Sequence, residues 1–268
     1  MRVLIVSNNS ERSRPAAYRA RELFAAAGDE ASVSEGGIGE AAADLCVVVG
    51  GDGTVLHVGK EAALRGIPVL ALNTGRVGFL TAQDAPAPLS AAELLRTAYR
   101  ERRGLLEVKV VGADGSVISS GCALNEAVVS RGGISRIIDI EVAVDGRGIY
   151  TVRGDGVIIA TPTGSTAYSM SAGGPIVAPE VSSVVVTPIC PYTLTARSVV
   201  LPDSAEVSAK VVGLDEREAV LTVDGAAPVS LREGEMAVVR RSERFLELLT
   251  PDEASFYEKI KTKLFGTV

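Results

Sequence analysis

The chain has 268 residues, a formal net charge of -6, a sequence isoelectric point near 5.1 and 47% hydrophobic residues. This apolar content is sufficient for a large folded core, and the acidic balance excludes a broad basic surface for nucleic acid. The N-terminal stretch MRVLIVSNN is too short for a secretory signal or a membrane span. We therefore expect a cytoplasmic protein with neither nucleic-acid nor membrane partners.

The first hundred residues alternate between short apolar runs and segments of helical periodicity. The predicted strands are residues 2–7, 45–49 and 67–72, and the predicted helices are residues 14–27, 55–64 and 86–103. Unbroken Val and Leu runs are typical of parallel strands that are buried on both faces. We therefore predict an α/β, Rossmann-like domain over residues 1–104.

Beyond residue 104 the pattern changes to short strands with turn signals, such as ADGS at 113–116 and DGRG at 145–148. This pattern predicts a mostly-β, sandwich-like domain over residues 105–245. Residues 253–264 return to helical periodicity, with Phe256, Ile260 and Leu264 on one face. We expect the C-terminal segment, residues 246–268, to pack back on the first domain.

The most informative segment is GDGVIIATPTGSTAYSMSAGGP at 154–175, in which half of the residues are Gly, Ser or Thr. A short apolar run at 157–160 predicts a buried strand that leads into a polar loop. Glycines allow close backbone approach to a ligand, and hydroxyls offer donors and acceptors. A Ser/Thr-rich surface linker is the alternative, but Tyr168 and Met170 argue against it, because an aromatic ring can stack on a base.

A second glycine-rich motif, GGDGT at 50–54, follows an apolar strand and precedes a helix. Ligands bind at this edge of open α/β sheets, and the helix N-terminus favours phosphate. Asp52 repels phosphate, so it is better explained as a general base, a hydroxyl acceptor or a Mg²⁺ ligand. The alternative is a simple turn without chemistry.

Two further polar groups follow or interrupt apolar runs. The segment LALNTGRVGFLT at 70–81 places Asn73, Gly75 and Gly78 after a strand, and Asn125-Glu126 lies within strand-like surroundings. Turn formation explains the first group equally well. The Asn-Glu pair is unusual in β-structure unless it has partners, and ribose hydroxyls are suitable partners, whereas an exposed strand end is the alternative.

Taken in order, GGDGT at 50–54, NTGRVGFLT at 73–81, LNEAVVSR at 124–131 and the 154–175 segment resemble the bacterial NAD kinases. TPICPYTL at 187–194 continues the resemblance, which covers essentially the whole chain. GGDGT also occurs in the diacylglycerol, sphingosine and phosphofructokinase families, so a lipid kinase is an alternative enzyme. An NAD(P)-binding regulatory module is the non-catalytic alternative.

The resemblance implies transfer of a phosphoryl group from ATP or polyphosphate to the 2′-hydroxyl of the adenosine ribose of NAD, which makes NADP. It implies a divalent metal cation, with Mg²⁺ preferred, and a homodimer or homotetramer. Asp52 would be the general base, and no protein metal ligand is predicted. The residues implied to bind substrate or nucleotide are Gly53, Asn125, Glu126, Asp155, Thr163, Thr166, Ala167, Tyr168 and Ser171.

Several finer assignments follow from the same resemblance. Asp155 would reach the nicotinamide portion, either within one chain or from a neighbouring subunit. Arg136 and Arg153 stand where the family places basic groups near the substrate, and solvated surface arginines are the alternative. His57 lies five residues after Asp52, where it would bind phosphate, pack or face solvent. Many relatives carry Gln after an Asp-Gly pair where this chain has Ala226, so we predict no site residue there.

Overall fold

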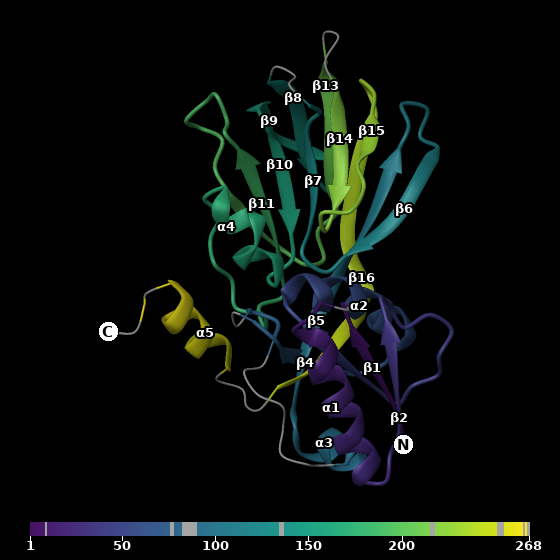
Figure 1. Cartoon of the computed structure of the whole chain (residues 1–268). Coiled ribbons are helices and arrows are strands. Elements are labelled where there is room, and N and C mark those ends of the chain that lie inside the picture. The colour runs from purple at the N-terminus through teal and green to yellow at the C-terminus, as the bar shows by residue number, and fades with distance from the viewer. Residues whose placement is uncertain are drawn as a thin grey trace. The chain divides into compact units, whose positions relative to one another are not determined.

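The computed structural model describes residues 1–8, 10–75, 78–81, 90–133, 137–214, 218–250, 255–264 and 266. These residues form two compact units: Met1–Arg103 together with Arg244–Val268, and Gly104–Glu243. The sequence predicts changes of pattern after residues 104 and 245. Two long strands, β5 (Tyr99–Val111) and β16 (Met236–Thr250), each begin in one unit and end in the other (Figure 1).

The first unit is built on a parallel sheet. Its strands pair in the order β2-β1-β3-β4, and the end of β16 adds a further parallel strand beside β4. The bounds are β1 Arg2–Ser7, β2 Glu30–Glu35, β3 Leu45–Gly50 and β4 Val69–Asn73. Every residue of β3 is buried, as expected for the central strand of a sheet that is covered on both faces. The predicted Rossmann-like class of this unit is confirmed.

Helices follow the strands of the first unit. Their bounds are α1 Ser13–Ala26, α2 Asp52–Arg65 and α3 Ala91–Thr97. Helix α1 packs Ala17, Ala20 and Phe24 into the core at helical spacing. Helix α2 ends where Gly66 adopts a left-handed conformation (φ 66°), which glycine tolerates without steric cost.

The predicted helix over residues 86–103 is wrong beyond Thr97. Helix α3 stops at Thr97, and β5 starts at Tyr99; residues 82–89 lie outside the described part of the chain. Burial alternates along the start of β5, but its buried positions hold Glu101 and Arg103, which form an ion pair at 2.8 Å. The strand period of two is hidden in the sequence because charged residues occupy positions that apolar ones normally fill.

The second unit is an antiparallel β-sandwich. One sheet contains β5, β6 (Val117–Ala123), β8 (Ile138–Val144), β9 (Arg147–Gly154), β13 (Val207–Gly213) and β16. The other runs β12-β11-β10-β7-β14-β15. Its bounds are β7 Glu126–Arg131, β10 Gly156–Ala160, β11 Ser183–Ile189, β12 Val199–Pro202, β14 Ala219–Val223 and β15 Val229–Leu231.

Side chains from both sheets share one apolar core, which includes Val108, Ile140, Val157 and Val186. Facing sheets that bury alternate residues in a common core define a sandwich. The predicted turn at 145–148 is also present, since Asp145 (φ 49°) and Gly146 (φ 74°) connect β8 to β9. The mostly-β, sandwich-like prediction is therefore confirmed.

The C-terminal helix α5 (Ser255–Leu264) belongs to the first unit. Phe256 is 2% exposed, and its ring centroid lies 6.2 Å from that of Phe79. This contact confirms that the C-terminal segment packs on the first unit; residues 253 and 254 of the predicted helix lie outside the described residues. Among the helices that the structure describes, none has the length and apolar character that crossing a membrane requires.

Candidate functional site

Asp52 stands at the carboxyl end of β3 and is the first residue of α2. Its Oδ2 accepts a hydrogen bond from the backbone N–H of Phe79 at 2.7 Å, and Oδ1 accepts one from Leu80 at 3.2 Å. Both oxygens are therefore held by backbone donors that follow β4. Each carboxylate oxygen retains further acceptor capacity for a ligand hydroxyl.

The short segment Gly78–Thr81 supplies these donors. The N–H of Gly78 donates to Thr81 Oγ1 at 2.9 Å, and Thr81 is fully buried. A Cβ at residue 78 would overlap the carboxylate of Asp52, so only glycine permits this approach. The two glycine-rich motifs of the sequence thus meet, because β3 and β4 are neighbours with Gly50 opposite Asn73.

Other predicted residues of the first unit are less engaged. Gly53 and His57 are both exposed on α2. Helical geometry places residues five apart about 140° from each other around the axis, so His57 does not share the face of Asp52. Asn73 exchanges hydrogen bonds with the backbone of Gly75, which supports the turn-forming explanation for that pair.

In the second unit, the Asn125-Glu126 pair is anchored by a residue that the sequence analysis assigned no role. The carboxylate of Asp224 accepts from the N–H groups of Leu124 (2.8 Å), Asn125 (2.8 Å) and Glu126 (3.0 Å). Asp224 has φ 49° and precedes Gly225. In the sequence this Asp-Gly pair signals only a turn, and the partners lie about a hundred residues away along the chain.

Glu126 combines burial with an unsatisfied oxygen. Its side chain is 8% exposed, and no described residue donates a hydrogen bond to Oε2. Burial raises the pKa of Glu126 to about 7, and the negative charge of Asp224 adds to the shift. A buried polar atom without a partner marks a place where a ligand group can complete the hydrogen bonding.

The end of β10 is tied to the start of β7. Thr161 donates its hydroxyl to the carbonyl of Leu124 at 2.7 Å and its N–H to that of Asn125 at 2.8 Å. Gly164 donates its N–H to Thr161 Oγ1 at 3.0 Å, and a Cβ on Gly164 would overlap the backbone of Asn125. The Asn-Glu pair and the glycine-rich 154–175 segment therefore form one cluster.

The predicted polar loop after β10 is partly helical. Residues Gly164–Thr166 form a 3₁₀ turn, and Tyr168–Ser171 form the short helix α4. Tyr168 is 46% exposed, and Ser171 is also exposed, so both can reach a ligand. Thr163 is buried, and its carbonyl accepts from the hydroxyl of Thr166 at 3.1 Å, while Ala167 is half-buried between the two turns.

Asp155 lies at the opposite end of these strands. Its Oδ1 accepts from Arg131 Nε at 2.7 Å, and its neighbour Gly156 faces Ser130, whereas Ala160 faces Glu126. Five residues of strand therefore separate Asp155 from the position that faces Glu126, a distance of about 16 Å. Within one chain the structure does not bring Asp155 to Glu126. Arg153 is exposed, 3.8 Å from the carboxylate of Asp139, and Arg136 lies outside the described residues.

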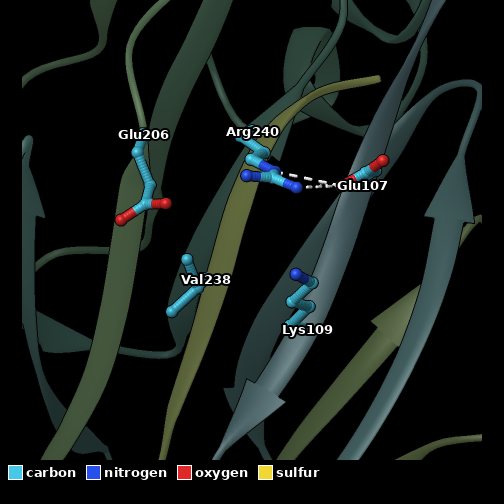
Figure 2. A pocket seen from close by; sticks show the side chains of 5 residues that line it. All are labelled: Glu107, Lys109, Glu206, Val238 and Arg240. Carbon is cyan, nitrogen blue, oxygen red and sulfur yellow. Dashed lines mark hydrogen bonds and ion pairs between the residues drawn. The ribbon is translucent and has the colours of Figure 1, made fainter. Parts of the chain in front are cut away.

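A surface pocket of the second unit shares no residue with these clusters. It is lined by Glu107, Lys109, Glu206, Val238 and Arg240. Figure 2 shows that Arg240 turns toward Glu107, and its Nε and Nη2 both donate to Glu107 Oε2, at 2.9 and 2.8 Å. None of these five residues belongs to the predicted site, and their charges largely compensate each other.

The fold and the two clusters define a class of protein. The first unit offers a helix N-terminus for phosphate beside the Asp52 carboxylate, and the second offers a loop rich in hydrogen-bonding groups. These are the features that a kinase acting on a small molecule needs. Family models agree with this class: the ATP-NAD kinase N-terminal domain matches residues 5–102, and the ATP-NAD kinase C-terminal domain matches residues 124–250. The chain belongs to the NAD kinase family.

Individual relatives support the same assignment. The NAD kinase of Aromatoleum aromaticum is 40% identical over 227 residues, which cover 84% of this chain and 74% of the relative. That of Symbiobacterium thermophilum is 41% identical over 226 residues, which cover 84% of this chain and 79% of the relative.

Two solved structures are also similar. Yeast NADH kinase complexed with NADH has a TM-score of 0.83 at 25% identity, with 99% of this chain and 87% of that chain covered. An NAD kinase from Archaeoglobus fulgidus in complex with ATP has a TM-score of 0.72 at 27% identity, with 99% and 98% covered. The chain is therefore an enzyme of a family that phosphorylates NAD to NADP with ATP, which decides against the lipid kinase and the regulatory module.

Proposed function

We propose that Asp52 is the general base of this NAD kinase. It takes the proton from the 2′-hydroxyl of the adenosine ribose of NAD, and the hydroxyl oxygen then attacks the terminal phosphorus of the donor. ADP, or a shortened polyphosphate, leaves with the electron pair of the broken P–O bond. One observation carries the proposal: the N–H groups of Phe79 and Leu80 donate to the Asp52 carboxylate and orient it at the N-terminus of α2.

Phosphate chemistry suits the surroundings of Asp52. The N-terminus of a helix presents N–H groups and the positive end of its dipole, which favours a phosphate that gains charge in transfer. Gly51 and the exposed Gly53 leave this end of α2 open. A base fixed beside bound phosphates needs little reorganisation when the proton moves.

We assign NAD binding to the cluster of the second unit. Glu126 Oε2, which has no partner among the described residues, and the side chain of Asn125 would bind ribose hydroxyls, and the exposed ring of Tyr168 would stack on a ring of NAD. Thr166, Ala167 and Ser171 belong to the same segment as Tyr168 and are also proposed to bind NAD. The buried Thr163 supports this segment, because its carbonyl accepts the hydrogen bond of the Thr166 hydroxyl. His57 and Arg153, both exposed, remain proposed phosphate-binding residues, and Gly53 is proposed to approach the nucleotide through its backbone.

A divalent cation fits this site as a companion of the donor phosphates. Among the described residues no three His, Cys, Asp or Glu side chains gather in a way that holds a metal. Mg²⁺ is usually bound through one or two carboxylates together with substrate phosphates. The cation would be held mainly by the donor phosphates, whose charge it would neutralise when bound, which leaves Asp52 to act as the base.

We also propose that the enzyme is a homodimer or homotetramer in which Asp155 serves a neighbouring active site. The strand register supports this, because it leaves Asp155 about 16 Å along the strands from Glu126 within its own chain. Light scattering would report the assembly. Co-assembly of an Asp155→Ala chain with an Asp52→Asn chain should restore part of the activity if Asp155 acts between subunits, and no restoration would contradict this.

The decisive experiment is a coupled NADP assay with NAD and either ATP or polyphosphate in the presence of Mg²⁺. Asp52→Asn should lower kcat about 10²- to 10⁴-fold, the range that a general base contributes, while the dissociation constant for NAD changes little. Asp44→Asn, at an exposed carboxylate of the same unit, is the matched control and should keep full activity. Wild-type turnover by Asp52→Asn would sink the proposal.

A further inference from the structure

The C-terminal helix reaches the segment that holds Asp52. Lys259 of α5 donates from Nζ to the carbonyl oxygen of Phe79 at 3.0 Å. The N–H of the same Phe79 donates to Asp52 Oδ2 at 2.7 Å. One residue therefore connects the helix, through its carbonyl and its amide, to the catalytic carboxylate.

The side chain of Phe79 is held by the same helix. Phe256 packs against the ring at a centroid distance of 6.2 Å, and Lys263 Nζ lies 5.1 Å from the ring centroid on its face. A tilted aromatic pair and a cation over a ring face are both attractive contacts. Helix α5 thus contacts both the carbonyl oxygen and the ring of Phe79.

Lys259 is placed where a charge is costly. Burial lowers the pKa of Lys259, and the positive charges of Arg103 and Lys263 lower it further, while the carboxylates of Glu101 and Asp52 act in the opposite direction. Removing an ammonium from water is unfavourable unless hydrogen bonds and opposite charges compensate. The compensating groups of Lys259 include the carbonyl of Phe79 and the carboxylate of Asp52 itself.

We propose that Lys259 is a positioning residue for the phosphoryl-transfer reaction. It fixes the peptide groups of Phe79 and Leu80 and, through them, the carboxylate of Asp52. One residue of the C-terminal helix then supports the reaction, although the helix carries none of the glycine-rich motifs. This inference rests on the proposed role of Asp52 as general base.

The test compares Lys259→Met and Lys259→Arg in the full-length enzyme, with Lys261→Met as control. Lys261 is exposed on the same helix. Lys259→Met should lower kcat about 10- to 100-fold, because small misplacements of a catalytic group cost rates of this order, and should leave the dissociation constant for NAD within twofold. Lys259→Arg, which keeps a cationic donor, should recover most of the loss, and Lys261→Met should match the wild type.

A double-mutant cycle separates positioning from general stability. If Lys259 acts through Asp52, Lys259→Met should reduce kcat less than threefold in an Asp52→Asn background. The inference would be overturned if Lys259→Met lowered kcat by the same factor in both backgrounds. It would also be overturned if Lys259→Met had wild-type kcat while Asp52→Asn was inactive. Either result would leave the role of Asp52 intact. An active Asp52→Asn enzyme would instead refute the proposed function. Should Lys259→Met unfold, Lys259→Gln is substituted in the same cycle, and the same criterion decides.

Discussion

The carboxylate of Asp52 occupies the space that a side chain at residue 78 would need. Gly78 has no Cβ, and this allows Asp52 to approach the backbone of the segment after β4 and accept from Phe79 and Leu80. Two glycine-rich motifs separated by some twenty residues thus have one structural purpose. The first supplies the carboxylate, and the second supplies the backbone donors that orient it.

Gly78→Ala should therefore damage the reaction more than substrate binding. The added methyl group would displace the Asp52 carboxylate, and we expect kcat to fall about 10- to 100-fold while the affinity for NAD stays nearly constant. Steady-state kinetics and a binding titration without donor measure the two quantities.

Gly75→Ala provides the matched control for Gly78→Ala. Gly75 lies on the same connection after β4, and no heavy atom lies within 4 Å of the position that its Cβ would take. We expect its kcat to remain within twofold of the wild type. Equal kinetics of the two variants would show that the approach of Asp52 to residue 78 is unimportant.

In the second unit, Gly164→Ala should weaken NAD binding. Its Cβ would overlap backbone atoms of Asn125, which cannot rotate away as a side chain can. Overpacking of this kind costs about 1 to 3 kcal/mol, so we expect KM for NAD to rise about tenfold and thermal stability to fall. Gly121→Ala, at an exposed position with open space, should change neither, and an unaltered KM in Gly164→Ala would contradict the tie between these loops.

Substitution of Tyr168 tests whether the cluster of the second unit determines NAD affinity while Asp52 determines kcat. Its exposed ring on α4 is proposed to stack on a ring of NAD. Since aromatic contacts contribute about 0.5 to 1.5 kcal/mol, Tyr168→Ala should raise the dissociation constant for NAD about 2- to 10-fold and alter kcat less. Tyr168→Phe keeps the ring and should bind normally. An unchanged affinity in Tyr168→Ala would argue against stacking.

The fold was largely predictable because its strands obey simple patterns. The apolar β-branched runs of β3 and β10 and the Asp-Gly turn after β8 report burial and chain reversal directly. The start of β5 was not predictable, because its inward positions carry Glu101 and Arg103, whose mutual ion pair helps to make that burial tolerable. Likewise, α2 begins at Asp52 rather than at Val55, since the glycines before Val55 conceal the helix start.

The site was predictable where its residues belong to local motifs. Asp52 and the Asn125-Glu126 pair stand in recognisable stretches, but the residues that support them come from distant parts of the chain. Asp224 lies about a hundred residues from its three donors, and Lys259 lies 180 residues from Phe79. A lysine beside an apolar helix face signals only solvent exposure. Long-range hydrogen bonds of this kind leave no local pattern in one sequence.

Glu126 should make stability depend on pH. Burial and the charge of Asp224 raise its pKa in the folded protein to about 7 from a usual value of 4.5. The folded state therefore holds a proton that the unfolded state has released between these two pH values. The stabilisation is fully present below about pH 4.5 and is lost as pH rises through about 7.

Glu126→Gln, which resembles the protonated acid in shape, removes this dependence. One pKa unit corresponds to about 1.4 kcal/mol, so the variant should gain on the order of 3 kcal/mol relative to the wild type between pH 4.5 and pH 8. Thermal unfolding of both proteins at several pH values would reveal a widening difference in Tm in favour of the variant. Glu107→Gln, at a more exposed carboxylate of the same unit, controls for general charge effects. A constant difference in Tm between wild type and Glu126→Gln across this range would mean that Glu126 titrates normally in the folded enzyme.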